Sequence, residues 1–457
     1  MAYSSSGPKP IERASKASHH HIINDSVVQA TLANLYVPPP QDPEVLLAKA
    51  HEFRPVTSRI ANVIAIDGGY TEIPVRANFP SATVHFFQFG ALLLRLEDLR
   101  TVAMSRHPDP DDMSKLKRIE RLKLALPTRN ARFKGQSTLR DSVRREIYAF
   151  FCRERLAEPT SLMDTLAWFL FRRYKGPDKD SDDAAWKLSS NPHDDGEDPR
   201  FGPIELRESS MSREFTFPCP VTGKPIFLTD AVRLHERIDE DSGAGGIVGY
   251  VAGVIEHMIA IHIVRHLVRT DPESLAEVLF ILDRPTGFFG QTSRLHLPML
   301  DLVRWTQTKH GLFWAGLEKS GAFVDHAAEI SLVMKAGTFL VLDDDYIYKY
   351  ICAGESEPDP KRAYAATSYY GHKVIFKTRA GNVYVVSVPV HWLKKSPSRA
   401  DLPNLDVILT HVEDLKCDMY ENALFPVALA NKLVSLSAFP STQILTQFAR
   451  STVKEAP

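Results

Sequence analysis

Two aspartates that follow short apolar runs are the residues of this sequence best placed to do chemistry. Asp67 follows the run at 62–66, and Asp283 follows the run at 278–282. Runs of β-branched and aliphatic residues that stop at a turn former are typical of buried central strands. An aspartate at each strand end therefore suggests a two-carboxylate metal site assembled by the fold. The alternative is that each aspartate only caps the turn that follows it.

A third carboxylate, Glu256, lies inside the apolar segment 246–264, which is predicted to be a helix. Its helical neighbours, three and four residues away, are all small or apolar: Ala252, Gly253, Ile259 and Ala260. An unpaired carboxylate on such a face is costly. Glu256 therefore needs a cation, which is either an arginine or a metal ion shared with Asp67 and Asp283.

The same apolar segment has to be considered as a membrane span. It carries Glu256, His257 and His262 near its middle, and basic residues follow it at once. A charge at the centre of a span costs roughly 2.5–3.5 kcal/mol on insertion scales. We therefore expect a buried helix in the core of a soluble protein, with no membrane contact.

Further apolar runs are expected to build the sheet that positions these residues. One strand at 310–318 should end at a turn that begins with Lys319, and the segment 82–94 should form a hairpin with the Asp67 strand. Other strands are expected at 339–342, 373–377 and 383–388, and helices at 400–417 and 425–437. The fold class predicted from these elements is α/β.

Composition sets limits on the class of protein. The chain has 457 residues, 44% of them hydrophobic and 24% charged, which is typical of a soluble globular protein. Its net charge of −1 gives no overall attraction to nucleic acid, so a site for a polyanion must come from local patterning. Four widely spaced cysteines and a polar N-terminus without a secretory signal favour a cytoplasmic location. We expect a flexible tail at 1–42, one domain at 43–440 with an inserted module at about 100–240, and a C-terminal tail at 441–457.

One stretch, residues 115–145, is strongly basic against this neutral background. The candidates for contact with DNA phosphates are Lys115, Lys117, Arg118, Arg121, Lys123, Arg129, Arg132 and Lys134, and Arg140, Arg144 and Arg145 continue the stretch. The alternative is a solvated helical face.

The order of these features resembles the NurA nucleases, which act with HerA-type DNA translocases. The likeness is carried by VIAIDGGYTE at 63–72, VLFILDRPTG at 278–287, LFWAGLEKSG at 312–321 and ALFPVALANKLVSLS at 423–437. Two departures stand out. The Asp-Gly-Ser context that is usual in the family is Asp283-Arg284-Pro285 here. The C-terminal motif has Phe425 where a tyrosine is usual, and Ala430-Asn431-Lys432 where the family commonly has a histidine.

The resemblance implies an RNase H-like mixed sheet flanked by helices, a homodimer, and a hexameric HerA-type ATPase as partner. It also implies a metal-dependent deoxyribonuclease in DNA end processing or anti-phage defence, with Mn²⁺ or Mg²⁺ held by Asp67, Glu256 and Asp283. Glu240 and Glu236 are alternatives for the third ligand. Lys319 would act on the scissile phosphate, unless it is only a turn lysine.

Two rival interpretations remain open from the sequence. The first is a silent NurA-like subunit that binds the ATPase and DNA without cutting, which the departures at Phe425 and Ala430 favour. The second is another RNase H-like enzyme, such as a phosphotransferase, but the sequence has no Walker-type phosphate loop.

Overall fold

The computed structural model describes residues 18–35, 37, 44, 48–98, 121–156, 159–194, 196, 198–352, 354, 359, 362–417, 423–436 and 440–453. The chain divides into two compact units, residues 1–41 and 42–457.

The first unit contains two short helices, α1 (Ser18–Ile23) and α2 (Ser26–Ala33). The Asp25 side chain caps α2 by accepting hydrogen bonds from the N–H groups of Val27 and Val28. Such a cap satisfies donors that the first helical turn leaves free. Within the segment expected as an N-terminal tail, these residues are helical, and none of the residues of α2 is buried.

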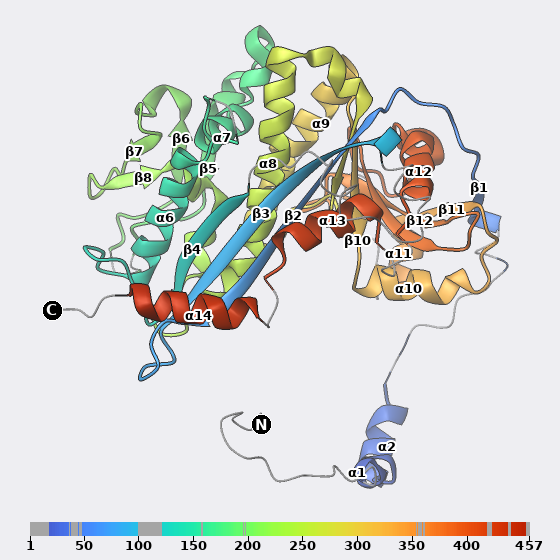
Figure 1. Cartoon of the computed structure of the whole chain (residues 1–457), viewed down its shortest axis with the longest axis horizontal. Coiled ribbons are helices and arrows are strands. Elements are labelled where there is room, and N and C mark those ends of the chain that lie inside the picture. The colour runs from blue at the N-terminus through green and yellow to red at the C-terminus, as the bar shows by residue number, and fades with distance from the viewer. Residues whose placement is uncertain are drawn as a thin grey trace. The chain divides into compact units, whose positions relative to one another are not determined.

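A mixed sheet of nine strands forms the centre of the second unit (Figure 1). Across the sheet the strands follow the order β1-β11-β12-β13-β10-β9-β2-β3-β4. Their bounds are β1 His51–Glu52, β2 Asn62–Pro74, β3 Thr83–Arg95, β4 Leu122–Arg129, β9 Val278–Leu282, β10 Phe313–Glu318, β11 Thr338–Val341, β12 Gly371–Lys377 and β13 Val383–Pro389. The pairs β2–β9 and β9–β10 are parallel and the others antiparallel. The predicted α/β class with a mixed sheet is confirmed.

The strand that carries Asp67 is longer than its apolar run. β2 and β3 form the predicted hairpin and pair from Asn62 opposite Arg95 to Pro74 opposite Thr83. Because β3 supplies hydrogen-bond partners along this whole length, β2 continues past Asp67 instead of ending there. The prediction of a strand that stops at Asp67 was wrong, although the parallel pairing of β2 with β9 does stop at Ile66.

Helices cover both faces of the sheet. α12 (Leu405–Asp414) and α13 (Phe425–Val434) pack on the face that includes Val63 and Ala65. The opposite face, which includes Ile64 and Ile66, packs against α6 (Leu139–Arg153), α7 (Leu162–Leu170), α8 (Val248–Thr270) and α9 (His296–His310). Further along that face, α10 (Ala322–Ser331) and α11 (Asp344–Tyr350) cover Ile375 and Val385. Figure 1 shows α13 in front of β2 and β3 and α8 behind them.

The apolar segment that contains Glu256 is α8, as predicted. The helical stretch Gly245–Thr270 is long and apolar enough to cross a membrane by length and composition, but 83% of its most apolar window is buried inside the protein. α8 is thus a core helix, whose apolar side chains contact the sheet and the helices beside it.

The segment at about 100–240, which we expect to be an inserted module, contributes β4 as the edge strand of the main sheet, and its helices α6 and α7 share the core of that sheet. Small two-stranded sheets, β5 (Ala185–Leu188) with β6 (Ile204–Arg207) and β7 (Thr216–Pro218) with β8 (Pro225–Phe227), complete the segment.

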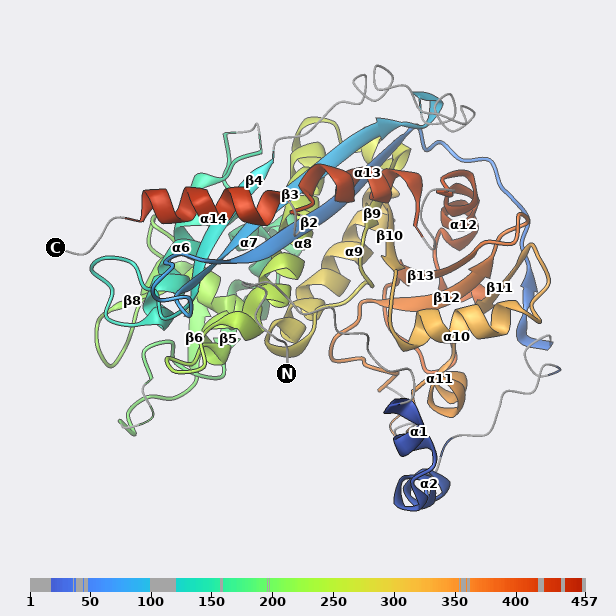
Figure 2. The same ribbon diagram turned by 60° about the horizontal axis from the view of Figure 1, so that its bottom comes forward.

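The C-terminal tail expected at 441–457 is also largely structured. Residues Ser441–Thr452 form α14, and the hydroxyl of Thr442 lies 3.2 Å from that of Thr71 in β2. Ala449 is buried and the Phe448 ring lies 6.4 Å from the Phe86 ring of β3. α13 and α14 therefore follow each other over the same face of the β2–β3 hairpin (Figure 2).

Candidate active site

The sheet register places Asp67 and Asp283 side by side. The parallel ladder between β2 and β9 ends with Ile66 opposite Leu282, so Asp67 and Asp283 are the next residues on their strands. Neighbouring strands lie about 4.8 Å apart. The predicted meeting of two aspartates from distant parts of the chain is therefore found in the fold.

Lys319 joins this pair from the next strand. β10 runs parallel to β9, with Gly316 opposite Leu282, and ends at Glu318. Lys319 follows directly, and its Nζ lies 2.5 Å from Oδ2 of Asp283. The Lys319 side chain is 31% exposed and that of Asp283 is 8% exposed. Lys319 therefore links the buried carboxylate to the surface.

Each aspartate keeps one buried oxygen without a hydrogen-bond partner among the described residues. Asp67 Oδ1 accepts a hydrogen bond of 2.8 Å from the N–H of Gly68, whereas Asp67 Oδ2 has no partner there. Asp283 Oδ1 also has no hydrogen-bond partner among the described residues. Buried polar atoms are nearly always hydrogen-bonded, so two orphaned oxygens on adjacent carboxylates suggest that a ligand completes the site.

Burial raises the pKa of both aspartates, and the charges of neighbouring carboxylates add to the rise at Asp67. Burial, and then the charges of Asp283 and Glu256, raise the pKa of Asp67 to about 8, against the opposing effects of the Gly68 N–H and Lys319. Burial also raises the pKa of Asp283, which Lys319 opposes. Strongly perturbed carboxylates of this kind cluster at functional sites.

Glu256 reaches the site from α8 and is ion-paired with Arg284. It is almost fully buried, and its Oε2 accepts a hydrogen bond from Nε of Arg284. Burial raises the pKa of Glu256, and Arg284 opposes that rise. Of the two cations that the sequence left open for Glu256, the structure shows the arginine.

Asp67 and Glu256 approach from opposite faces of the sheet. Alternation along β2 puts Asp67 on the face of Val63 and Ala65, which α13 covers. Glu256 comes from the α8 side and meets β2 at Gly68, where an added Cβ would lie 2.8 Å from Glu256 Oε1. Gly68 therefore leaves the space that the Glu256 carboxylate needs.

The donor set suits a hard divalent cation, with two carboxylates rather than three. No group of three His, Cys, Asp or Glu side chains is arranged to hold a metal ion within the part of the chain that the structure describes. Mg²⁺ and ions like it are commonly bound by one or two carboxylates together with water and substrate phosphate oxygens. Asp67 and Asp283, with their two orphaned oxygens, fit that pattern.

The sequence did not identify Arg284 as a site residue. Two features of the sequence could have indicated an arginine here. Glu256 requires a cation, and Gly253, one turn earlier on the same helix face, has no side chain and so leaves space beside Glu256. In the structure an added Cβ at Gly253 would lie 2.5 Å from Nη1 of Arg284. The arginine thus occupies the gap that this glycine leaves.

The alternative third ligands are engaged elsewhere. Glu240 accepts hydrogen bonds from the backbone N–H groups of Leu139 and Arg140 at the start of α6. Glu236 is paired with Arg233 at 2.7 Å. Neither glutamate therefore replaces Glu256 at the strand ends.

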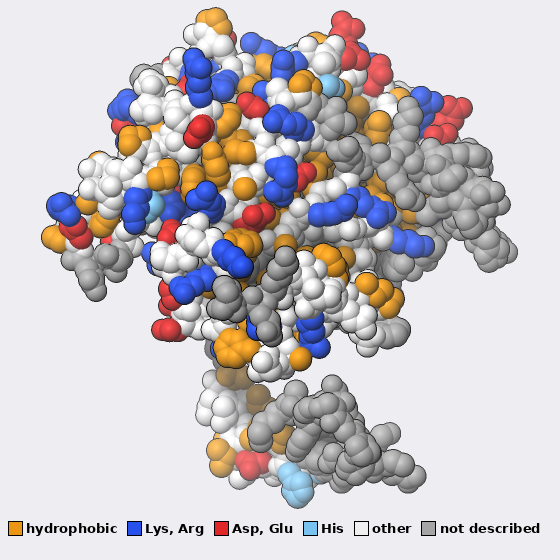
Figure 3. Space-filling model, turned by 60° about the vertical axis from the view of Figure 1, so that its left-hand side comes forward, with side chains coloured by type: hydrophobic (Ala, Val, Ile, Leu, Met, Phe, Trp, Pro, Cys, Tyr) orange, Lys and Arg blue, Asp and Glu red, His pale blue; other side chains and the backbone are white. Residues whose placement is uncertain are grey.

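The basic stretch is divided by the fold. Lys115, Lys117 and Arg118 lie outside the described residues. Exposed side chains are found at Arg121, Lys123, Arg129, Arg132 and Lys134, in and around β4. The space-filling view from the side of β4 and α6 shows Lys and Arg side chains spread over this surface (Figure 3).

Lys123 in particular lies on the face of Asp67. Leu122 and Leu124 of β4 point into the core on the α8 side, so Lys123 between them points to the opposite face. Arg144 has a different role, because it is buried and bonded through Nη2 to Asp230 at 2.7 Å. Arg144 therefore fits neither explanation of the basic stretch, because its side chain is not solvated.

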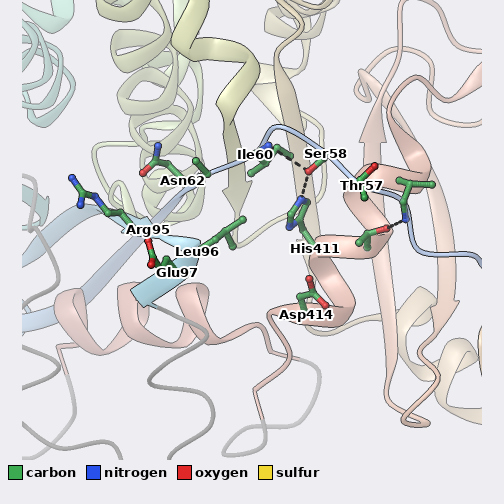
Figure 4. A pocket seen from close by; sticks show the side chains of 12 residues that line it. Thr57, Ser58, Ile60, Asn62, Arg95, Leu96, Glu97, His411 and Asp414 are labelled. Carbon is green, nitrogen blue, oxygen red and sulfur yellow. Dashed lines mark hydrogen bonds between the residues drawn. The ribbon is translucent and has the colours of Figure 1, made fainter.

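A cavity of about 1110 Å³ lies at the other end of β2 (Figure 4). It includes Asn62, the first residue of that strand, which places it about 17 Å along the strand from Asp67. In its wall the Ser58 hydroxyl lies 2.7 Å from Nε2 of His411 and also accepts a hydrogen bond from the N–H of Ile60. These contacts fasten the segment before β2 to α12, and the cavity is separate from the carboxylates.

No family model and no curated protein matches this sequence. Among solved structures, the chain is similar to the NurA nuclease from Sulfolobus solfataricus, with 10% identity and a TM-score of 0.36 over 97% of this chain and 99% of that one. It is also similar to a crystal structure of NurA with manganese, at 14% identity, a TM-score of 0.29 and coverage of 96% and 99%. A further NurA structure matches at 10% identity and a TM-score of 0.27, over 88% and 90% of the two chains.

Proposed function

We propose that this protein is a metal-dependent deoxyribonuclease in which Asp67 and Asp283 hold Mn²⁺ or Mg²⁺. The observation that carries the proposal is the pair of adjacent, buried carboxylates, each with an oxygen that lacks a partner among the described residues. The motifs shared with NurA nucleases support the choice of a phosphodiester as substrate.

In this proposal Asp67, Asp283 and Lys319 have different roles in hydrolysis. A divalent cation supplies Lewis-acid charge to a phosphodiester and to its attacking water. Asp67 and Asp283 orient that charge within a site of low dielectric, where it acts strongly. Lys319 holds Asp283 in place and, being partly exposed, can also donate to a phosphate oxygen at the mouth of the site.

The same proposal assigns the exposed basic residues around β4 to the DNA backbone. Lys123 is exposed on the edge strand β4, on the sheet face of Asp67, so we assign it to the DNA backbone. Contacts from lysine and arginine to phosphates fix position without reading the base sequence. We therefore propose cleavage that does not depend on base sequence.

A HerA-type hexameric ATPase as partner, a homodimer, and a role in DNA end processing or anti-phage defence extend the proposal. Their support is the motif resemblance, because the structure contains a single chain. Size-exclusion chromatography with light scattering, on the chain alone and mixed with the ATPase, tests both assemblies directly.

A silent DNA-binding subunit is the second candidate, and two observations favour it. Lys319 and Arg284 already pair with Asp283 and Glu256. In addition, Phe425 and Ala430 replace the tyrosine and histidine of the family motif.

Cleavage assays separate the two candidates. Linear single- and double-stranded DNA is incubated with the protein in Mn²⁺, Mg²⁺ or EDTA, with and without the ATPase. We expect metal-dependent cleavage that Asp67→Asn and Asp283→Asn abolish and that Asp345→Asn, at an exposed aspartate of α11, leaves intact. If wild type does not cut in any condition but binds DNA, the silent subunit is the correct assignment.

A further inference from the structure

Arg284 is held in place by two elements, α8 and β10. Its Nε donates to Glu256 of α8, and its guanidinium lies against Gly253 one turn earlier on that helix. Its backbone carbonyl lies against β10, where an added Cβ at Gly316 would be 2.4 Å from that oxygen. Two glycines therefore leave room for this one arginine, so its position is built into the fold.

The charges at the site identify what the arginine replaces. Asp67, Asp283 and Glu256 carry three negative charges when ionised, and Lys319 and Arg284 carry two positive charges. One divalent cation then gives the centre a net positive charge, which suits a phosphodiester. Without Arg284, the centre with one divalent cation would be neutral, and the buried Glu256 carboxylate would lack the cation that pairs with it.

We infer that Arg284 takes the place of a second metal ion, so that the centre binds one divalent cation through Asp67 and Asp283. This inference rests on the proposed function. Arg284 keeps Glu256 out of the coordination sphere by occupying its Oε2, and so acts as a positioning residue. A guanidinium suits this role because it stays charged when buried and forms directed hydrogen bonds to carboxylates.

The number of bound ions tests the inference without any measurement of activity. The full chain is stripped with EDTA, and Mn²⁺ is titrated by calorimetry and by the loss of the free Mn²⁺ signal in electron paramagnetic resonance. We expect one Mn²⁺ per wild-type chain. In Arg284→Gln, Glu256 is released from its ion pair, so we expect a second Mn²⁺ to bind per chain.

A double variant serves as the matched control. Glu256→Gln/Arg284→Gln replaces the ion pair by two neutral amides, so no buried charge is left without a partner. It should still bind one Mn²⁺ with wild-type affinity to within about threefold, because Glu256 is not a ligand. This variant decides the question even if Arg284→Gln does not fold, as judged by circular dichroism.

Two results would overturn the inference. One is two Mn²⁺ per wild-type chain, falling to one in the double variant, because Glu256 would then be a metal ligand. The other is a single ion that the double variant loses. A different result, unchanged Mn²⁺ binding in Asp67→Asn, would instead remove the proposed metal centre itself.

Discussion

The ionisable residues of the candidate site are defined by their burial as much as by their identity. Asp67 is 7% exposed and Glu256 is 1% exposed, so each would ionise at a cost in the absence of a cation. Lys319 and Arg284 meet part of that cost, but an oxygen of Asp67 and one of Asp283 stay unsatisfied within the described structure. The carboxylate oxygens that could bind a metal ion are thus the same atoms that destabilise the folded protein when no cation is bound.

The raised pKa of Asp67 predicts how stability depends on pH when no metal is present. An unfolded aspartate titrates near 3.9, whereas burial and then the neighbouring carboxylates raise the pKa of Asp67 to about 8 in the folded protein. Between these values the folded state binds the extra proton. The free energy of unfolding should therefore fall as pH rises from about 4 to about 8, by up to about 1.4 kcal/mol per pH unit from this group.

Urea denaturation in EDTA at pH 5 and at pH 8 measures this effect. Asp67→Asn cannot ionise, so it should gain stability relative to wild type as the pH rises. Profiles for the two proteins that stay parallel over this range would show that Asp67 has an ordinary pKa.

A further buried ion pair includes Glu318, the residue before Lys319, and we predict that it stabilises the fold and takes no part in catalysis. Lys373 of β12 pairs with Glu318 of β10, and its Nζ lies 4.2 Å from the ring centroid of Phe323 and 4.4 Å from that of Tyr369. Removing one partner of a buried pair leaves an uncompensated charge and costs roughly 3–5 kcal/mol.

We therefore expect Lys373→Met to lower the free energy of unfolding by about that amount. The double variant Lys373→Met/Glu318→Leu should recover most of the loss. Equal unfolding midpoints for wild type and Lys373→Met would contradict this account of the pair.

At the scale of the elements, the site depends on how α13 docks on β2. An added Cβ at Gly69 would lie 2.3 Å from the backbone carbonyl oxygen of Val434, at the end of α13. Gln88 of β3 donates a hydrogen bond of 2.9 Å to the neighbouring carbonyl of Leu433. The close approach of helix and hairpin thus requires a glycine two residues after Asp67.

Gly69→Ala should therefore destabilise the protein by roughly 1–3 kcal/mol, because backbone atoms must shift to admit the methyl group. Gly202→Ala is the control, since an added Cβ there meets nothing within 4 Å, and its effect should stay within about 0.5 kcal/mol. Thermal unfolding of both variants provides the comparison, and equal melting temperatures would contradict the proposed packing.

Local sequence patterns predicted the strands whose pairing partners lie close in the sequence or whose apolar run is unbroken. The run before Asp283 forms β9 as expected, and the β2–β3 hairpin was predictable from its two apolar strands and the turn between them. The end of β2 was missed because the apolar run stops at Asp67, while the pairing with β3 continues to Pro74 and α14, from the far end of the chain, packs on this extension. Nor could the sequence give the sheet order, which depends on long-range pairing.

The site was predictable in its residue types but only partly in its pairing. An unpaired Glu256 on an apolar helix face called for a cation, and nothing local chose between an arginine and a metal ion. The choice depends on Arg284 of another element and on the space at Gly253. For the same reason Lys319 could be predicted to end a strand, but not to contact Asp283.

At the scale of the whole molecule, the charge on each face of the sheet says more about DNA binding than the net charge does. The net charge of −1 hides exposed basic residues such as Lys123 of β4, which shares a sheet face with Asp67. Binding of DNA through phosphates should depend on salt according to the number of such contacts.

Lys123→Ala should weaken DNA binding about equally for all sequences and reduce the slope of log affinity against log salt by about 1. Lys187→Ala is the matched control. Lys187 is exposed in β5, whose Trp186 packs into the core on the α8 side. Fluorescence anisotropy over a range of salt concentrations measures both slopes. An unchanged slope in Lys123→Ala would remove β4 from the DNA path.

The most direct test of the metal centre is anomalous diffraction from crystals soaked in Mn²⁺. The account predicts one anomalous peak between the carboxylates of Asp67 and Asp283, with Arg284 still bound to Glu256. No peak at this position, or an ion bound elsewhere while both carboxylates stay empty, would contradict the central claim.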